Sequence, residues 1–148
     1  MTKPRTATIK NKSAIWTIFK MYRKILPHIR TDYLQRHIES KNVIYEKKVV
    51  IIWQQYQRAV TLGNQKIAKG TYIVHQIVNG KQGDGNANKV LNKFLKTLPI
   101  KSECILTVRR SNHIARRFYK KNGFRPFGII NWSNNKIDGL IYKIKIKA

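Results

Sequence analysis

The chain has 148 residues, with 31 Lys or Arg and 6 Asp or Glu, so its formal net charge is +25. Because 42% of the residues are hydrophobic, the chain can bury a core, which excludes global disorder. No apolar run reaches the roughly 20 residues of a membrane-spanning helix, and a single cysteine, Cys104, excludes an internal disulfide. We expect one cytoplasmic domain, residues 1–148, of mixed α and β structure.

The first half of the chain is predicted to contain a short strand, two helices and three further strands. Apolar residues spaced along one helix face predict helices at residues 13–26 and 31–39. Runs rich in β-branched and aromatic residues predict strands at residues 6–9, 42–45, 49–56 and 72–78. Residues 57–70 are expected to form a long basic loop, with a partial extension of the preceding hairpin left open.

The second half is predicted to alternate helices with strands. One helix is expected to end at Leu98, before Pro99, and another to span residues 112–121, with Gly123 as its left-handed cap. The expected strands are residues 104–108, 127–132 and 140–146. The order of elements indicates antiparallel hairpins combined with one strand–helix–strand crossover.

A glycine-rich turn at residues 79–87 joins the strand at 72–78 to the next helix. Unpaired backbone N–H groups and the positive end of the helix dipole make such a turn an anion site. Gly83 and Gly85 have no Cβ to hold a pyrophosphate away, and the small Ala87 lets the helix begin close to it. The turn is neither a Walker loop nor a dinucleotide-binding fingerprint. Glycines after a strand can also form a plain turn, so both interpretations stay open.

Two segments resemble the GCN5-related N-acetyltransferase (GNAT) superfamily. The first fits the family signature Q/R-x-x-G-x-G/A, with Gln82, Gly83, Asp84, Gly85, Asn86 and Ala87. The second, residues 112–124, resembles the family segment N-x-x-A-x-x-F-Y-x-x-x-G-F. The likeness spans nearly the whole chain. It implies a mixed, V-shaped sheet of six to seven strands flanked by four helices, in which the strands at 72–78 and 104–108 splay apart to admit acetyl-CoA.

The resemblance also implies roles for individual residues. Residues 82–87 would hold the pyrophosphate of acetyl-CoA, and the backbone of Ile77 and Val78 would pair with its pantetheine arm. Asn112 and Ala115 would lie near that arm. Tyr119 would lie beside the thioester sulfur and protonate the leaving thiolate; the alternative for Tyr119 is a core aromatic on a helix face.

The strand at 72–78 carries no carboxylate to serve as the general base that relatives of this family use. His75 has an intrinsic pKa suited to a base near neutral pH, although a histidine in a strand can equally be structural. Glu46 and Glu103 are poorer candidates because both fall at strand edges.

The missing carboxylate suggests an acceptor amine of low pKa. An α-amino group titrates near 7.7–8.0 and a lysine near 10.4. A much larger fraction of an α-amine than of a lysine is therefore neutral near pH 7 without a general base. A basic protein would suit such an amine on a polyanion, namely aminoacyl-tRNA or an aminated base of modified DNA. The alternatives are a small-molecule or protein amine as the acceptor, and a non-catalytic GNAT-fold module that binds nucleic acid.

Basic and aromatic residues supply the candidates for nucleic-acid contact. They are Trp53, Tyr56, Arg109, Arg116 and Trp132, with core packing as the alternative for each tryptophan. The charge itself could instead reflect a lysine-rich composition. The four histidines show no metal-ligand spacing, so we expect no metal. Members of the family commonly dimerise, which leaves a homodimer open.

Overall fold

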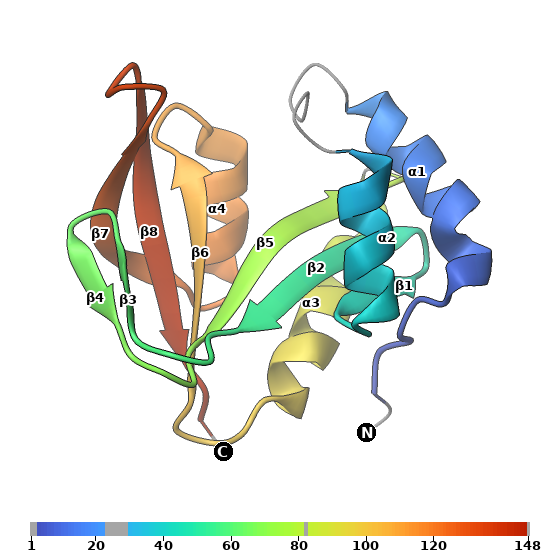
Figure 1. Ribbon diagram of the computed structural model, residues 1–148, viewed down its shortest axis with the longest axis horizontal. Coiled ribbons are helices and arrows are strands. Elements are labelled where there is room, and N and C mark those ends of the chain that lie inside the picture. The colour runs from blue at the N-terminus through green and yellow to red at the C-terminus, as the bar shows by residue number, and fades with distance from the viewer. Residues whose placement is uncertain (1–2, 23–29, 82, 148) are drawn as a thin grey trace. The chain divides into compact units, whose positions relative to one another are not determined.

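The computed structural model describes residues 3–22, 30–81 and 83–147 (Figure 1). Its helices are α1 (Lys12–Met21), α2 (Thr31–Glu39), α3 (Asn86–Thr97) and α4 (His113–Lys121), with a 3-10 turn at Ile9–Asn11. Its strands are β1 (Val43–Glu46), β2 (Val49–Gln55), β3 (Val60–Leu62), β4 (Gln65–Ile67), β5 (Tyr72–Asn79), β6 (Glu103–Arg109), β7 (Arg125–Trp132) and β8 (Ile137–Lys145).

Six strands form one sheet in the order β1-β2-β5-β6-β8-β7, and β3 pairs with β4 in a separate ribbon. β5 and β6 run parallel, whereas β1–β2, β6–β8 and β7–β8 are antiparallel. The predicted α/β fold is thus confirmed: the described part of the chain has a six-stranded mixed sheet and four α-helices.

The chain forms two compact units. The first comprises residues 1–53 and 76–97, and the second comprises residues 54–75 and 98–148. β5 contributes to both, because Tyr72–His75 belong to the second unit and Gln76–Asn79 to the first. The single domain expected from the sequence stays a prediction.

In the first unit, α1 and α2 cover one face of the β1–β2 hairpin and α3 covers the other (Figure 1). Val43 pairs with Ile52, and both are fully buried in an apolar cluster with residues of α1 and α2. Successive side chains of a strand point to opposite faces, so Trp53, next to Ile52, points to the other face. There the Trp53 ring lies 5.5 Å from the ring of Phe94 on α3.

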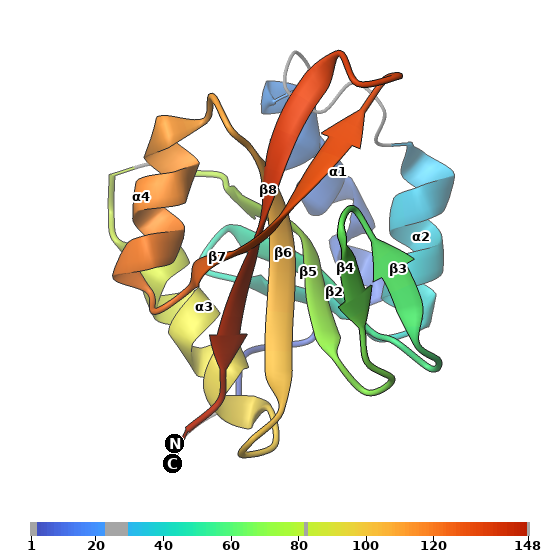
Figure 2. The ribbon, with the colours of Figure 1, turned by 90° about the vertical axis from the view of Figure 1, so that its left-hand side faces the viewer.

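In the second unit, α4 covers one face of the β6–β8–β7 sheet and the β3–β4 hairpin covers the other (Figure 2). On the α4 side, Arg116 donates a hydrogen bond to the Tyr142 hydroxyl at 3.2 Å. On the hairpin side, Ile67 packs in a buried cluster with Ile105 and Ile141.

The expectation of a long loop at residues 57–70 is wrong, because this segment forms the β3–β4 hairpin. The turn of the hairpin docks on β7. The Asn64 N–H donates to the Ile129 carbonyl at 3.0 Å, and Asn64 Oδ1 accepts the Ile129 N–H at 2.9 Å. Gly63 has a φ of +56°, and a Cβ at this position would lie 2.1 Å from the Ile129 oxygen. The hairpin therefore depends on contacts about 65 residues away in sequence, which no local pattern reveals.

Two boundaries near the N-terminus also differ from those expected. α1 ends at Met21, because the backbone angles of Tyr22 (φ −110°, ψ 23°) are no longer those of an α-helix. The predicted end at Leu26 lies outside the described residues. The strand expected at residues 6–9 is reduced to one β-bridge at Thr6, because the 3-10 turn already begins at Ile9.

A pair of glycine substitutions tests the docking of the hairpin. Gly63→Ala and Gly70→Ala both place a Cβ at positive φ, which costs about 1–2 kcal/mol, but only Gly63→Ala brings that Cβ against a carbonyl oxygen. We expect Gly63→Ala to lower the free energy of unfolding by a further 1–3 kcal/mol or so relative to Gly70→Ala. Chemical denaturation measures both values. Equal losses would mean that the contact with β7 does not hold the hairpin.

Candidate functional site

The turn between β5 and α3 is held in place by backbone and side-chain hydrogen bonds within the first unit. The Gly80 N–H donates to the Lys48 carbonyl at 2.8 Å. Asn79 accepts the Lys81 N–H at 3.0 Å and donates from its amide to Asp84 at 3.3 Å. The turn is therefore attached both to the β1–β2 hairpin and to its own distal end.

The Asp84 carboxylate occupies the start of α3. Its Oδ1 accepts the Asn86 backbone N–H at 2.9 Å, and its Oδ2 accepts the Asn86 amide at 3.0 Å. The hydrogen bond from that backbone N–H is the main cause that lowers the pKa of Asp84 below its usual value. The turn thus carries an ionised group of its own where the helix dipole is positive.

Gly83 and Gly85 are required by the backbone, since their φ angles are +84° and +74°. Among the described residues, and apart from each glycine and its two chain neighbours, no atom lies within 4 Å of the place where a Cβ would stand on either glycine. The space beside both glycines is therefore open, and the Asp84 carboxylate lies at the same helix start. Ala87 is half-buried in the first turn of α3, and Gln82 lies outside the described residues.

Ile77 and Val78 lie in the part of β5 that belongs to the first unit. The Val78 side chain is buried in the cluster with α1 and α2, whereas Ile77 is half-buried. β5 pairs with β6 from Tyr72 to Val74, and it then continues to Asn79. His75, next after the paired residues, is half-buried, and its Nε2 lies 2.8 Å from Gln54 Oε1.

The remaining residues of the family segment lie on α4, in the second unit. Asn112 is the N-cap of this helix, because its Oδ1 accepts the Ala115 N–H at 3.1 Å. Tyr119 is half-buried and packs edge-on against Phe124 and Tyr142. Burial raises the pKa of Tyr119 to about 12. Its phenol is therefore a proton donor, and not a phenolate, at any physiological pH.

The aromatic candidates for nucleic-acid contact take part in packing. Trp53 stacks at a tilt on Phe94, and Tyr56 and Trp132 pack against the buried cluster of the second unit. Burial also raises the pKa of Tyr56. Trp53 and Trp132 therefore pack against other side chains of the fold, which was the alternative to nucleic-acid contact.

The two arginine candidates differ. Arg116 donates both to the Tyr142 hydroxyl at 3.2 Å and to the Arg110 carbonyl at 2.8 Å, so the fold already uses two of its donors. Arg109 is exposed at the end of β6. Of the pair, Arg109 is the better placed to meet a partner from solution.

Both glutamates judged poorer bases are engaged in ion pairs. Glu46 bonds Lys93 at 2.7 Å and accepts the Arg5 N–H at 3.1 Å, and the bond to Lys93 is the main cause of its lowered pKa. Glu103 pairs with Lys143 at 3.1 Å. A carboxylate with a lowered pKa is a weaker base, so Glu46 is poorly suited to accept a proton from an amine.

Two classes of site have no basis in the residues described. No three side chains of His, Cys, Asp or Glu gather there as metal ligands. No helix there combines the length and the apolar character needed to cross a bilayer; α3 has 12 residues.

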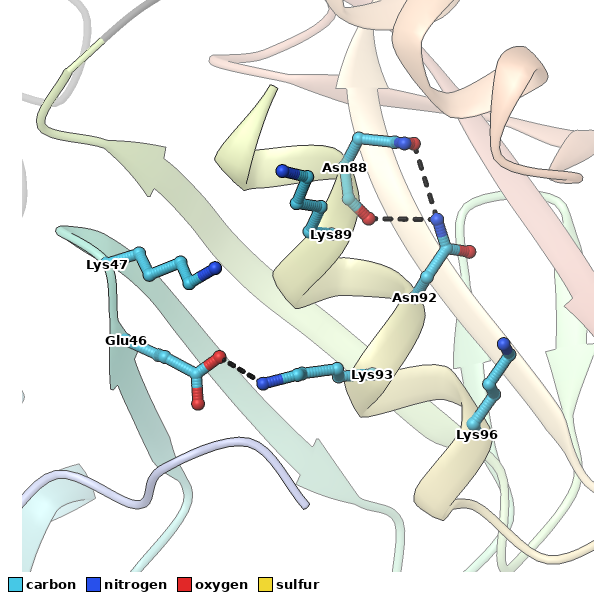
Figure 3. Close-up of a pocket in the computed structure, with 7 residues that line it drawn as sticks. All are labelled: Glu46, Lys47, Asn88, Lys89, Asn92, Lys93 and Lys96. Carbon is cyan, nitrogen blue, oxygen red and sulfur yellow. Dashed lines mark hydrogen bonds and ion pairs between the residues drawn. The ribbon is translucent and has the colours of Figure 1, made fainter. Parts of the chain in front are cut away.

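Sequence reasoning missed one feature of the first unit. A pocket of about 430 Å³, lined mainly by lysines, lies between α3 and the β1–β2 turn (Figure 3). Its parts lie about 40 residues apart in the sequence, and only the packing of α3 on the hairpin joins them.

No protein-family model and no curated protein matches the sequence. The fold, however, is that of the GNAT acetyltransferases. It is similar to a GNAT-family acetyltransferase from Streptococcus agalactiae, with a TM-score of 0.78 and 13% identity over 99% of this chain and 95% of that one. The ribosomal-protein-S18-alanine N-acetyltransferase from Escherichia coli gives a TM-score of 0.68 and 15% identity, over 100% and 96%. The NatB acetyltransferase complex bound to CoA gives 0.70 and 10%, over 98% and 99%.

Proposed function

We propose that this protein is an acetyl-CoA-dependent N-acetyltransferase that acts on a primary amine. The observation that carries the proposal is the glycine turn at the start of α3, with open space at Gly83 and Gly85, in a chain that has the GNAT fold over its whole length. The similar structures named N-acetyltransferases, one of them bound to CoA, support the same activity.

The acetyl donor would supply a reactive thioester and a diphosphate. In our proposal Gly83, Asp84, Gly85, Asn86 and Ala87, together with Gln82, form the diphosphate site at the start of α3, and the diphosphate is bound by backbone N–H groups other than that of Asn86, which Asp84 accepts. The backbone of Ile77 and Val78 binds the amides of the pantetheine arm, and Asn112 and Ala115 contact the same arm. The Val78 N–H stabilises the oxyanion that forms when the amine attacks.

Tyr119 is the proposed general acid. When the thioester carbon accepts the amine, the carbon–sulfur bond breaks and the thiolate takes a proton from the Tyr119 hydroxyl. The pKa of about 12 keeps that proton on the phenol in the resting enzyme. The proton is therefore present on the phenol when the thiolate forms.

His75 is the proposed base or substrate contact. Its Nε2 lies 2.8 Å from Gln54 Oε1, and this contact holds the ring at the point where β5 leaves its pairing with β6. Neither Glu46 nor Glu103 competes for this role, because both are engaged by lysines.

For the acceptor, we propose an amine carried on nucleic acid, either aminoacyl-tRNA or a modified DNA base, acetylated in the cytoplasm. The net charge of +25 supports a polyanion, and the lack of a strong base supports an amine of low pKa. A small-molecule or protein amine is the second candidate. A module that binds nucleic acid without turnover is the third, and a homodimer is compatible with each.

The Asp84 carboxylate provides a test of the diphosphate site. Asp84→Asn removes its charge but keeps an oxygen that accepts the Asn86 N–H. Because an anion would no longer face the diphosphate, we expect CoA to bind roughly two- to fivefold more tightly. Isothermal titration calorimetry measures this, with the exposed Asp138→Asn as the control of equal charge change. An equal gain in both variants, or none in Asp84→Asn, would remove the diphosphate from this turn.

Tyr119→Phe tests the general acid. We expect kcat to fall by roughly 10²–10⁴-fold with the affinity for CoA unchanged. Because the pKa of Tyr119 is raised to about 12, wild-type activity should show no alkaline decline from this group below about pH 11. The half-buried Tyr45→Phe in the first unit serves as control. Full activity of Tyr119→Phe would exclude the proposed role.

The acceptor is tested with labelled acetyl-CoA. The protein is incubated with aminoacyl-tRNA, DNA, peptides and small amines, and the products are separated before and after nuclease digestion. We expect label in a nuclease-sensitive product. Label in peptides or small amines alone would favour the second candidate. CoA binding without any transfer would leave only the non-catalytic module.

A further inference from the structure

The pocket between α3 and the β1–β2 turn belongs entirely to the first unit (Figure 3). Lys89, Lys93 and Lys96 line it from α3, and Lys47 lines it from the turn. The other lining residues are Glu46, Asn88 and Asn92. Four lysines against one glutamate give the lining a formal charge of 4 − 1 = +3.

The single carboxylate of the pocket is already satisfied. Glu46 bonds Lys93 at 2.7 Å and also accepts the Arg5 N–H. Within the described chain, the ion pairs include neither Lys47 nor Lys89 nor Lys96. Lys89 and Lys96 thus line the pocket outside the ion pairs of the described residues, whereas Lys47 already acts electrostatically on Glu46.

These lysines are spread out instead of converging on one point. Lys89 and Lys96 are seven residues apart on α3, which corresponds to about 10 Å along the helix axis. Lys47 lies on the β1–β2 turn, opposite α3 and beside the Glu46–Lys93 pair (Figure 3). Separate cations at this spacing suit a chain of phosphates better than a single phosphate.

The turn that carries Lys47 has a strained backbone. Lys47 and Lys48 have φ angles of 51° and 64°, and they connect the paired residues Glu46 and Val49. A two-residue turn with both φ angles positive strongly favours Asn-Gly. Lysine at this place carries a charge to the rim of the pocket at a cost in backbone strain.

We propose that this pocket binds the phosphates of a nucleic-acid strand and so docks the proposed substrate. The inference rests on the proposed function only for the choice of nucleic acid as the polyanion. The lining contains no aromatic side chain, so it offers no platform for base stacking. Contacts from lysine to phosphate fix position and carry no sequence information, so binding here is independent of sequence.

The test is binding of a short fluorescein-labelled RNA or DNA oligonucleotide, followed by anisotropy at about 50–200 mM salt. The pocket variant combines Lys47→Asn, Lys89→Gln and Lys96→Gln. The control combines Lys41→Asn, Lys10→Gln and Lys20→Gln, all exposed in the first unit and outside the pocket. Lys41 also has a positive φ of 62°, so its replacement matches that of Lys47 in both charge and backbone.

We expect the pocket variant to lose affinity by roughly tenfold or more, and its log–log salt slope to shrink by about two to three units. The control should keep nearly all affinity and slope. The single variant Lys47→Asn should also raise the melting temperature while it weakens binding. Equal losses in pocket variant and control would overturn the proposal.

Two further readouts distinguish failure of this inference from failure of the proposed function. CoA affinity should stay unchanged in the pocket variant. Loss of both CoA binding and oligonucleotide binding would indicate general damage to the fold and would overturn the assignment of the pocket. Polyglutamate competing as well as the unlabelled oligonucleotide would overturn nucleic acid as the occupant. Oligonucleotide binding that depends on the pocket, in a protein without acetyl transfer, would uphold this inference and refute the proposed activity.

Discussion

The hydrogen bonds of Asp84 at the start of α3 are the constraint on which the candidate site depends. They tie the end of the glycine turn to the first residue of the helix, while Asn79 ties Asp84 back to the end of β5. With both ends fixed, the positive φ angles of Gly83 and Gly85 follow from closing a short path between strand and helix. A second attachment, from Gly80 to the Lys48 carbonyl, joins this turn to the β1–β2 turn. The glycine turn and the rim of the lysine pocket are thus parts of one hydrogen-bonded framework.

The distribution of the few acidic residues explains why so much positive charge remains available. Glu46 and Glu103 each neutralise one lysine, and Asp84 is used by backbone and amide donors. These two lysines are partly buried with their partners, and the fold leaves most of its other cations outside any ion pair of the described residues. Binding of the proposed polyanion would relieve the self-repulsion among the unpaired cations and release counterions.

Sequence reasoning located the elements whose local pattern and tertiary role agree. The periodic apolar face of α3, the β-branched run of β5 and the capped helix α4 with Gly123 after it lie within one or two residues of their predicted positions. The family segments added the fold as a whole, because they indicate an arrangement of strands that periodicity cannot supply.

What the sequence could not reveal depends on partners distant along the chain. The short strands β3 and β4 are too brief for a periodic signal, and their turn is stabilised by Ile129. Arg116 looked like a surface cation because its partner, Tyr142, lies 26 residues away. The hydrogen bonds by which Asp84 fixes the turn were missed for a different reason. The family signature allows any residue at this position, so only the structure shows which groups its carboxylate accepts from.

The lysines at positive φ separate composition from function as explanations of the charge. Lys41 and Lys101 also adopt this conformation, so a lysine-rich composition does place the residue at positions that favour glycine. Both of those are single residues, where the strain is about 1–2 kcal/mol. Lys47 and Lys48 are consecutive, so the strain arises twice in one turn. The sequence that such a turn favours, Asn-Gly, differs at only these two residues. Total stabilities of about 5–15 kcal/mol leave little room for such strain without a return in binding. Composition bias explains a lysine at an isolated position, whereas a pair in one turn, with the first residue lining a cationic pocket, is what the proposed anionic partner would explain.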